Sequence, residues 1–314
     1  MIEHFADRTL AAIREKNAPV CVGFDPLIDR LPQEMLRAAH VDLDRGEPSD
    51  GQAAEAILAF GEEVIELVAP RVAIIKINIA FFERYRTAGV AAYHELVNRA
   101  ARAGLIVIGD VKRADIGHTS MQYAIGSLVE DASGDRTPPD AVTVNPYFGI
   151  DGVRPFIDVA RERSRGVFVL VQTSNASAAT VQGLALADGG TVGDHVARMV
   201  QGWAAEDGSL GSSGYSCVGA VVSPRDLEAT DRVRALMPNC LFLVPGFGAQ
   251  GRTPEEVARC FKPDGTGAIV AASRSVIFAY HDAKRRDARA SNWRTCIEDA
   301  CDEMVQQVRE VLGA

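Results

Sequence analysis

Eight short apolar segments recur along this chain, and their recurrence restricts the possible fold more than any other feature of the sequence. Each segment is continuously apolar, without the alternation of a half-exposed strand, and this is typical of parallel strands buried on both faces. Patterns of helical periodicity separate the segments. We therefore expect parallel strands at residues 19–23, 72–77, 105–109, 141–144, 167–171, 218–222, 241–244 and 268–271.

Eight strands that alternate with helices predict a (β/α)8 TIM barrel, an α/β fold that a single domain of this length can form. A doubly wound open sheet is the competing arrangement, but no G-x-G-x-x-G motif follows the first strand. No shift in composition marks a domain boundary, so residues 1–314 are expected to form one domain. Helices are expected at 3–17, 52–69, 81–103, 117–130, 151–163, 224–236, 253–261 and about 291–312.

Two of the expected connections are longer than is usual for this fold. Residues 27–51 are polar and irregular in pattern, and residues 172–216 are rich in Ala, Gly and Ser. Long loops of compact domains often cover a binding site, but loops also tolerate surface insertions. The long insertion at about 172–216 therefore has two interpretations, a lid over the site and a surface insertion.

The composition excludes several classes of protein. The chain is 47% hydrophobic with a net charge of −9, which argues against nucleic-acid binding as its main function. Charges interrupt each apolar run well before the length of a transmembrane helix, and the first residues lack the apolar region of a secretory signal. Scattered histidines and the absence of a C-x-x-C pair predict a reduced cytoplasmic protein without a transition-metal site; the cysteines are Cys21, Cys217, Cys240, Cys260, Cys296 and Cys301.

Charged side chains follow the second and third expected strands. Lys76 ends the second strand, and Asp110, Lys112 and Asp115 follow the third. Asp110 and Lys112 lie two residues apart on extended chain, so they point to the same side. Such charges often form only a solvated loop with weak ion pairs, but a lysine that ends a buried strand must reach water or a carboxylate. The alternating charges therefore indicate a site at the carboxyl ends of the strands, where active sites of this fold lie.

The last two strands are followed by residues suited to a phosphate group. After the seventh comes Pro245-Gly246-Phe247-Gly248-Ala249-Gln250-Gly251, whose glycines let backbone N–H groups approach a ligand and whose glutamine adds an amide donor. Arg274 follows the eighth strand and offers a planar fork for two hydrogen bonds to phosphate. Because loops seven and eight of this fold commonly bind phosphate, the pairing predicts a phosphate site.

These motifs occur together with two further strand-end motifs. The full set is Gly23-Phe24-Asp25-Pro26, Lys76, Asp110-x-Lys112-x-x-Asp115-Ile116-x-x-Thr119, Thr173-Ser174, Pro245-Gly-x-Gly-Ala-Gln250-Gly251 and Arg274. In combination they resemble the orotidine 5'-phosphate decarboxylase family, and the resemblance extends from Val22 to Tyr280. The chain is similar to the longer-chain subgroup, with Gly117-His118 where shorter members often have Pro-Glu.

The resemblance implies decarboxylation of orotidine 5'-phosphate to uridine 5'-phosphate and CO2, the last step of de novo UMP synthesis, without a metal or organic cofactor. It implies that Lys112 gives a proton to C6 after CO2 leaves and that Asp110 lies beside the departing carboxylate. Lys76 would order the charged array and contact the ribose. The partners implied are the nucleotide substrate and a second copy of the chain, with no nucleic acid and no membrane.

The resemblance also implies the residues that bind the substrate. Asp25 and Asp115 would hold ribose hydroxyls, with Asp115 supplied by the neighbouring subunit of a homodimer and Thr119 reaching the same shared site. Ser174 would contact the pyrimidine amide. The phosphate would be held by the glycine-rich turn and the arginine after the eighth strand, that is, by Gly248, Gln250, Gly251 and Arg274.

Three alternatives stay open at the level of sequence. Related sugar-phosphate decarboxylases carry the same D-x-K-x-x-D motif but need Mg²⁺ and an acidic ligand at the end of strand two, where this chain has Lys76. A non-catalytic phosphosugar-binding barrel would not need Lys112. A Schiff-base aldolase needs a neutral amine, whereas flanking carboxylates favour a charged Lys112.

Overall fold

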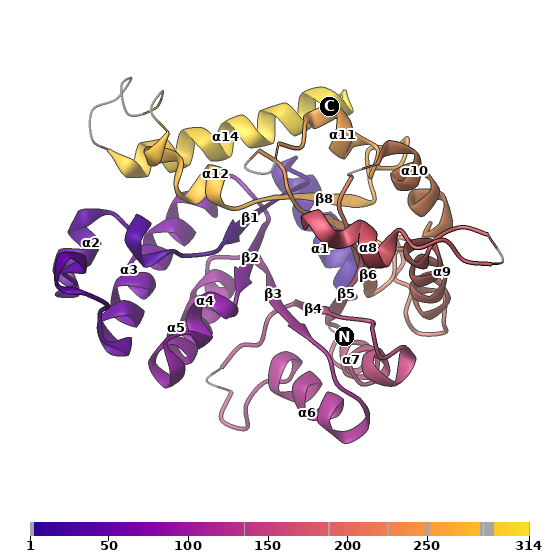
Figure 1. The fold of residues 1–314 in the computed structure, drawn as a ribbon, viewed down its shortest axis with the longest axis horizontal. Coiled ribbons are helices and arrows are strands. Elements are labelled where there is room, and N and C mark those ends of the chain that lie inside the picture. Colours follow the sequence, from indigo (N-terminus) through magenta and orange to yellow (C-terminus); the bar gives the residue numbers. More distant parts are fainter. Residues whose placement is uncertain are drawn as a thin grey trace.

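The eight apolar segments form eight strands, which pair in chain order and in parallel into a closed barrel, with β1 also next to β8. Figure 1 shows the strands at the centre of the molecule with helices around them. The fold predicted from the sequence is therefore confirmed. The strands are β1 (Val20–Phe24), β2 (Ile74–Asn78), β3 (Ile106–Arg113), β4 (Ala141–Val144), β5 (Gly166–Gln172), β6 (Val218–Val222), β7 (Phe242–Val244) and β8 (Ala268–Ala272).

The computed structural model describes residues 3–134, 136–187, 189–224, 226–248, 251–282, 285 and 292–313. Within these residues no helix has the length and apolar character needed to cross a membrane. The α-helices are α1 (Phe5–Lys16), α2 (Gln33–Ala38), α3 (Asp50–Val68), α4 (Ala80–Glu83), α5 (Arg86–Arg102), α6 (Gly117–Leu128), α7 (Ile150–Glu162), α8 (Ala179–Gln182), α9 (Val192–Ala204), α10 (Leu227–Leu236), α11 (Pro254–Ala258), α12 (Arg274–Ile277) and α14 (Trp293–Leu312).

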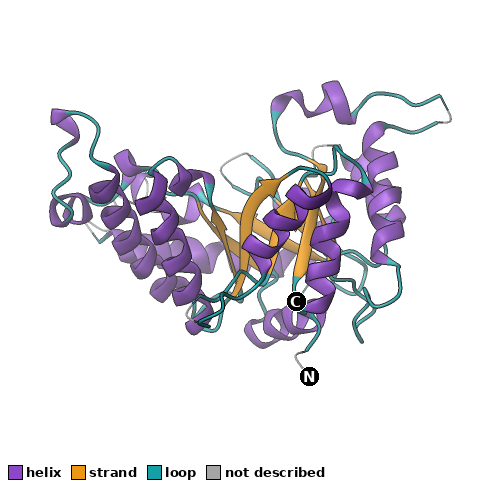
Figure 2. Cartoon of the chain, turned by 90° about the horizontal axis from the view of Figure 1, so that it is seen from below, coloured by secondary structure: helices purple, strands orange, loops and turns teal. Residues whose placement is uncertain are grey.

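Apolar side chains fill the barrel and separate its two ends. Residues that point inward from the strands form one buried cluster, which includes Ile74, Ile108, Phe168 and Ile269. Helix α1 lies across the end where the strands begin and inserts Phe5, whose ring meets Phe168 edge-on at 6.1 Å between centroids. A barrel packed in this way is a core rather than a channel, so a ligand has access only from the opposite end. In Figure 2 the strands run through the middle of the molecule with helices on both flanks.

The helix expected over residues 81–103 is wrong as a single element, because the chain forms two helices there, α4 and α5. Arg86 adopts a left-handed conformation with φ of 48°, which interrupts the helical path between them. Gly89 allows the two helices to pack tightly, because a Cβ at this position would lie 2.0 Å from the carbonyl oxygen of Phe82. Helical periodicity continues across the break, so the pattern of the sequence hides it.

The two long connections contain more regular structure than expected. Residues 27–51 hold α2, which buries Met35 and Leu36. Residues 172–216 hold α9, which packs against β5 and β6 in the place of the helix that joins these strands. The short helix α8 lies before it, in front of the barrel strands in Figure 1. Gln182 of α8 accepts the N–H of Thr173 and donates to the Thr173 hydroxyl, so α8 is held against the end of β5.

Candidate functional site

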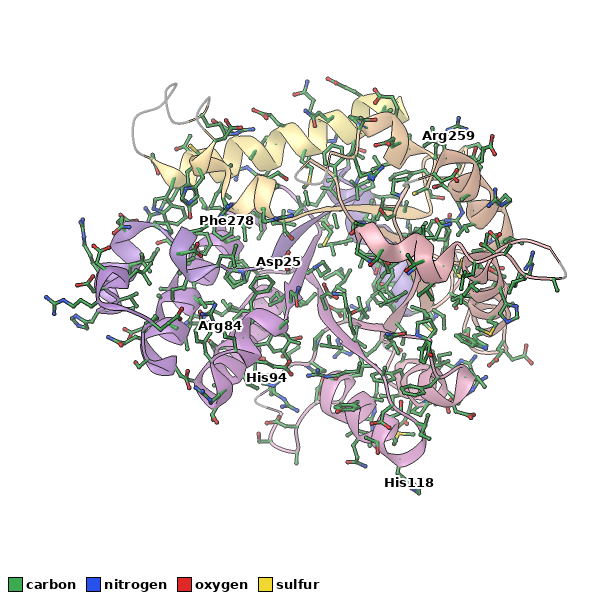
Figure 3. The ribbon with its side chains drawn as sticks, viewed as in Figure 1. Asp25, Arg84, His94, His118, Arg259 and Phe278 are labelled. Carbon is green, nitrogen blue, oxygen red and sulfur yellow. The ribbon has the colours of Figure 1, made fainter. Side chains whose placement is uncertain are left out.

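A pocket of about 230 Å³ opens at the carboxyl ends of the strands, where the sequence predicts the site. Six of the predicted site residues line it, and they come from five different strands or the turns that follow them: Asp25, Lys76, Asp110, Lys112, Ser174 and Arg274. The other lining residues are Thr143, Leu170, Thr173, Val221, Leu243, Pro245, Gly246, Phe247, Ala271, Ala272 and Ser273. Figure 3 shows Asp25 near the centre of the molecule, beside β1.

Two lysines and two carboxylates alternate at one side of the pocket. Lys76 Nζ donates to Asp110 Oδ2 at 2.9 Å and lies 3.8 Å from Asp25 Oδ1. Lys112 Nζ donates to Asp110 Oδ1 at 2.5 Å. The parallel register of the first three strands explains this proximity, because it pairs Gly23 with Lys76 and sets Lys76 beside β3. The predicted grouping of Lys76, Asp110 and Lys112 therefore forms, but the second carboxylate of the array is Asp25 and not Asp115, which was expected to join these residues.

Burial and charge act in opposite directions on the two most buried members of this array. Burial alone would raise the pKa of Asp110, but Lys76 and Lys112 outweigh it, and the pKa lies well below its usual range. Burial alone would lower the pKa of Lys76, but the Asp110 and Asp25 carboxylates outweigh it, and that pKa is raised. Both groups are therefore charged at neutral pH. Lys112 differs in having half of its side chain exposed, so its ammonium can reach a molecule in the pocket.

Asp25 contributes an oxygen that is available to a ligand. Its Oδ1 is buried, and no hydrogen-bond donor satisfies it among the residues that the structure describes. The nearest cation, Lys76, is 3.8 Å away and directs its hydrogen bond to Asp110 instead. A buried carboxylate oxygen without a donor is unfavourable unless a ligand supplies one. A hydroxyl group of a ligand is a donor that could satisfy this oxygen.

The pocket also has apolar lining residues, which form its floor. Val221, Leu243 and Ala271 belong to the cluster that fills the barrel, and Leu170 packs against that cluster. Ser174, two residues after the end of β5, adds a hydroxyl group to the lining. An apolar floor in a pocket that also offers a hydroxyl suits a flat ring whose rim carries polar groups.

The loops after β7 and β8 form another side of the pocket. Arg274 is exposed, opens α12 and has no carboxylate partner within the described ranges. Gly248 has φ of 71°, and a Cβ there would lie 2.9 Å from Ser275 Oγ, so this turn approaches the start of α12 closely. Gly248 and Gly251 are exposed in this turn without lining the pocket, and the predicted Gln250 lies outside the described residues. An arginine without a counter-charge beside a glycine turn is suited to an anion.

Asp115 and Thr119 do not line the pocket of their own chain. Asp115 Oδ1 accepts the N–H of Ile116 at 2.8 Å, and Thr119 is exposed in the first turn of α6. His118, the neighbour of Thr119, points outward at the edge of the molecule in Figure 3. The geometry of one chain therefore separates these two predicted residues from the other site residues.

Thr143 of β4 is a pocket residue that the sequence analysis did not single out. It is 1% exposed, and its Oγ1 donates to Asp110 Oδ1 at 2.8 Å. Its signal in the sequence was a polar residue inside the apolar segment 141–144. That signal is weak, because a threonine is common in strands for reasons of packing alone.

Cysteines and metal ligands play no visible part in this site. All six cysteines are buried and none forms a disulfide. The described part of the chain contains no group of three His, Cys, Asp or Glu side chains arranged to hold a metal ion. The pocket instead offers ammonium, carboxylate, hydroxyl and guanidinium groups.

A closed (β/α)8 barrel with such a set of groups at its carboxyl end defines a (β/α)8 enzyme. Comparison with known proteins identifies the family: residues 19–288 match the profile of the orotidine 5'-phosphate decarboxylase / HUMPS family. The chain belongs to this family.

Curated relatives and a solved structure agree with this assignment over nearly the whole chain. The orotidine 5'-phosphate decarboxylase of Rhodopirellula baltica is 37% identical over 311 residues, which cover 97% of this chain and 99% of the relative. That of Caldicellulosiruptor saccharolyticus is 33% identical, with 92% and 94% covered. The crystal structure of a provisionally assigned orotidine 5'-phosphate decarboxylase from Streptomyces avermitilis has a TM-score of 0.76 at 31% identity, with 100% and 97% covered.

Proposed function

We propose that this protein removes CO2 from orotidine 5'-phosphate to give uridine 5'-phosphate, the last step of pyrimidine (UMP) biosynthesis. The observation that carries this proposal is the charged array, in which ionised Asp110 lies between Lys76 and half-exposed Lys112. The array lines the same pocket as the apolar floor. The proposal is supported by curated relatives with this name that match from end to end.

The array suits the chemistry of this reaction. Loss of CO2 from C6 of the pyrimidine leaves a carbanion whose charge the ring cannot delocalise, so a fixed ammonium beside C6 lowers the barrier. Lys112 is the more exposed of the two ammonium groups that line the pocket, and it then transfers its proton to C6. Asp110 lies beside the departing carboxylate, and Lys76 keeps Asp110 ionised. This proton transfer forms the C–H bond at C6 of the product and leaves Lys112 as a neutral amine.

The rest of the nucleotide fits the other sides of the pocket. Asp25 Oδ1 accepts a hydrogen bond from a ribose hydroxyl, and Ser174 contacts the pyrimidine amide. Arg274 binds the phosphate together with the turn that contains Gly248, Gln250 and Gly251. Phosphate contacts far from C6 hold the ring against the array, a use of remote binding energy that raises the rate of the chemical step.

The Mg²⁺-dependent sugar-phosphate decarboxylases are the main rival within the same family. Their metal needs an acidic ligand at the end of strand two, and in this chain that position holds Lys76. The Lys76 ammonium lies between the carboxylates of Asp25 and Asp110, so it occupies the place and the counter-charges that a cation would need. A barrel that only binds a phosphosugar, without catalysis, would not need the pair formed by Lys112 and Asp110.

Chelation is expected to leave the activity unchanged. Decarboxylation of orotidine 5'-phosphate is followed by the loss of pyrimidine absorbance, before and after treatment with EDTA and then after addition of Mg²⁺. Because Lys76 and Lys112 together balance the charges of Asp25 and Asp110, all three rates should agree. A rate that falls on chelation and returns with Mg²⁺ would favour the sugar-phosphate alternative.

Replacing Arg274 with alanine is expected to raise the KM for orotidine 5'-phosphate by about 10- to 100-fold, the range for a charged hydrogen-bonding pair. The slow reaction of orotidine, which lacks the phosphate, should hardly change. Arg259→Ala is a matched control, because Arg259 is exposed and pairs with Asp231 away from the pocket. Equal losses on both substrates would instead assign Arg274 a structural role.

We also propose that the protein acts as a homodimer with active sites shared between its subunits. Exposed apolar side chains lie at the start of α6, along this helix and in the turn before α7: Ile116, Tyr123, Ile125, Tyr147 and Phe148. The two regions adjoin, because Ser120 donates to the carbonyl of Gly152. An apolar surface of this kind favours a protein partner, and it carries Asp115 and Thr119 at its edge. In the dimer these two residues reach the pocket of the second copy.

The protein is proposed to act in the cytoplasm, where the precursors of UMP are made. Six buried cysteines without a disulfide suit that reducing compartment.

A further inference from the structure

Strands β3 and β4 lose their regular pairing at the catalytic array. Gly109 pairs with Val142, and the next pair is Arg113 with Val144. Between these pairs β3 has three residues, Asp110, Val111 and Lys112, whereas β4 has only Thr143. The extra residues form a bulge, a feature that often redirects side chains beside active sites.

The bulge places Lys112 in a conformation that needs support. Its φ is 44°, in the left-handed region that residues with a side chain rarely adopt. Its backbone N–H donates to a side chain of the neighbouring strand, because Thr143 Oγ1 accepts the Lys112 N–H at 3.0 Å.

The same hydroxyl also fixes the carboxylate beside it. Thr143 Oγ1 donates its proton to Asp110 Oδ1 at 2.8 Å, the oxygen that also accepts from Lys112 Nζ. Because an ionised carboxylate only accepts, the direction of this bond is set, and the lone pairs of Oγ1 remain for the Lys112 N–H. Thr143 is 1% exposed, so water does not compete for either bond.

From this geometry we infer that Thr143 is a positioning residue for the decarboxylation, one that holds the Lys112 backbone and the Asp110 carboxylate in a single arrangement. The inference rests on the proposed function and adds a residue to it. Thr143 need not touch the substrate; it acts through the two residues that do. Its replacement should change kcat rather than substrate binding, since the groups proposed to bind ribose and phosphate lie on other strands.

The test compares three variants by steady-state kinetics and thermal unfolding. Thr143→Val keeps the shape but removes both hydrogen bonds, and kcat is expected to fall about 10- to 100-fold because small displacements of reacting groups have effects of this size. KM and the binding of UMP should stay near wild type. Thr143→Ser retains the hydroxyl and should restore most of kcat. Thr230→Val is the matched control, because Thr230 is fully buried and donates to the Asp226 carbonyl on α10, away from the pocket.

Two outcomes would overturn the inference. One is wild-type kcat in a folded Thr143→Val protein. The other is a fall in kcat in Thr143→Ser as large as that in Thr143→Val, because serine retains the hydroxyl and the loss would then not follow from the two hydrogen bonds. If Thr143→Val does not fold, Thr143→Ser and Thr143→Ala decide the question, with Ser active and Ala impaired in kcat alone. If the wild-type protein has no decarboxylase activity, the proposed function is refuted. If the wild type is active and one of the two outcomes above is found, only the inference about Thr143 is refuted.

Discussion

Replacing Lys112 with alanine is expected to lower kcat by about 10⁴-fold or more. The estimate combines the loss of charge stabilisation and of proton transfer, each of which is typically worth about 10²–10³ or more. The fold should survive, because the Lys112 side chain is half exposed and Asp110 keeps its bonds to Lys76 and Thr143. Turnover of orotidine 5'-phosphate and the thermal unfolding midpoint measure the two effects separately.

Two further lysine variants sharpen this experiment. Lys112→Arg retains a positive charge but cannot release a proton near neutral pH, so it should stay far below wild type. Lys262→Ala removes a lysine that lies over the Tyr215 ring outside the pocket, and it should retain full activity. Near-normal decarboxylation by a folded Lys112→Ala protein would refute the mechanism.

Much of the fold was predictable because buried parallel strands leave a local signal. Segments such as 141–144 and 218–222 match β4 and β6 residue for residue, since continuous apolar runs between polar turns define their own limits. Helix α9 was missed for the opposite reason. Its sequence contains glycines and follows a stretch rich in Ala, Gly and Ser, so composition suggested a loop. Its capping box, in which Thr191 and Asp194 bond reciprocally, is the local signal that could have located it.

The charged array was predictable for a different reason, namely that a barrel brings all strand ends to one face. Knowing only that Lys76 ends one strand and Asp110 the next places them together. What the sequence could not provide is the shape of β3 beyond Gly109. That strand was expected at 105–109, yet it continues to Arg113 through the bulge. The bulge depends on a side chain of the neighbouring strand, Thr143, and such a contact between distant residues leaves no trace in a local pattern.

Asp115 belongs to the same motif as Lys112, but it does not line the pocket of its own chain. The chain turns after β3, and the Asp115 side chain accepts the adjacent Ile116 N–H. It stands beside exposed Ile116 and near Phe148, at the edge of the apolar surface proposed to bind a second copy. In a two-fold symmetric dimer both subunits use the same surface, so every contact between them occurs twice. Each active site would then combine Lys112 from one subunit with Asp115 from the other.

Mixing two inactive variants is expected to restore activity if the site is shared in this way. Lys112→Ala and Asp115→Ala proteins are combined under conditions that exchange subunits, with tags of different mass to verify the exchange. Each mixed dimer then has one site with both defects and one wholly wild-type site. With random exchange half of the dimers are mixed, so roughly a quarter of all sites should recover, by the symmetry of the pair. The variants kept separate, and a mixture held under conditions without exchange, are the controls and should stay inactive. If Asp115 acts within its own chain, every site retains one defect, and verified exchange without any recovery would exclude a shared site.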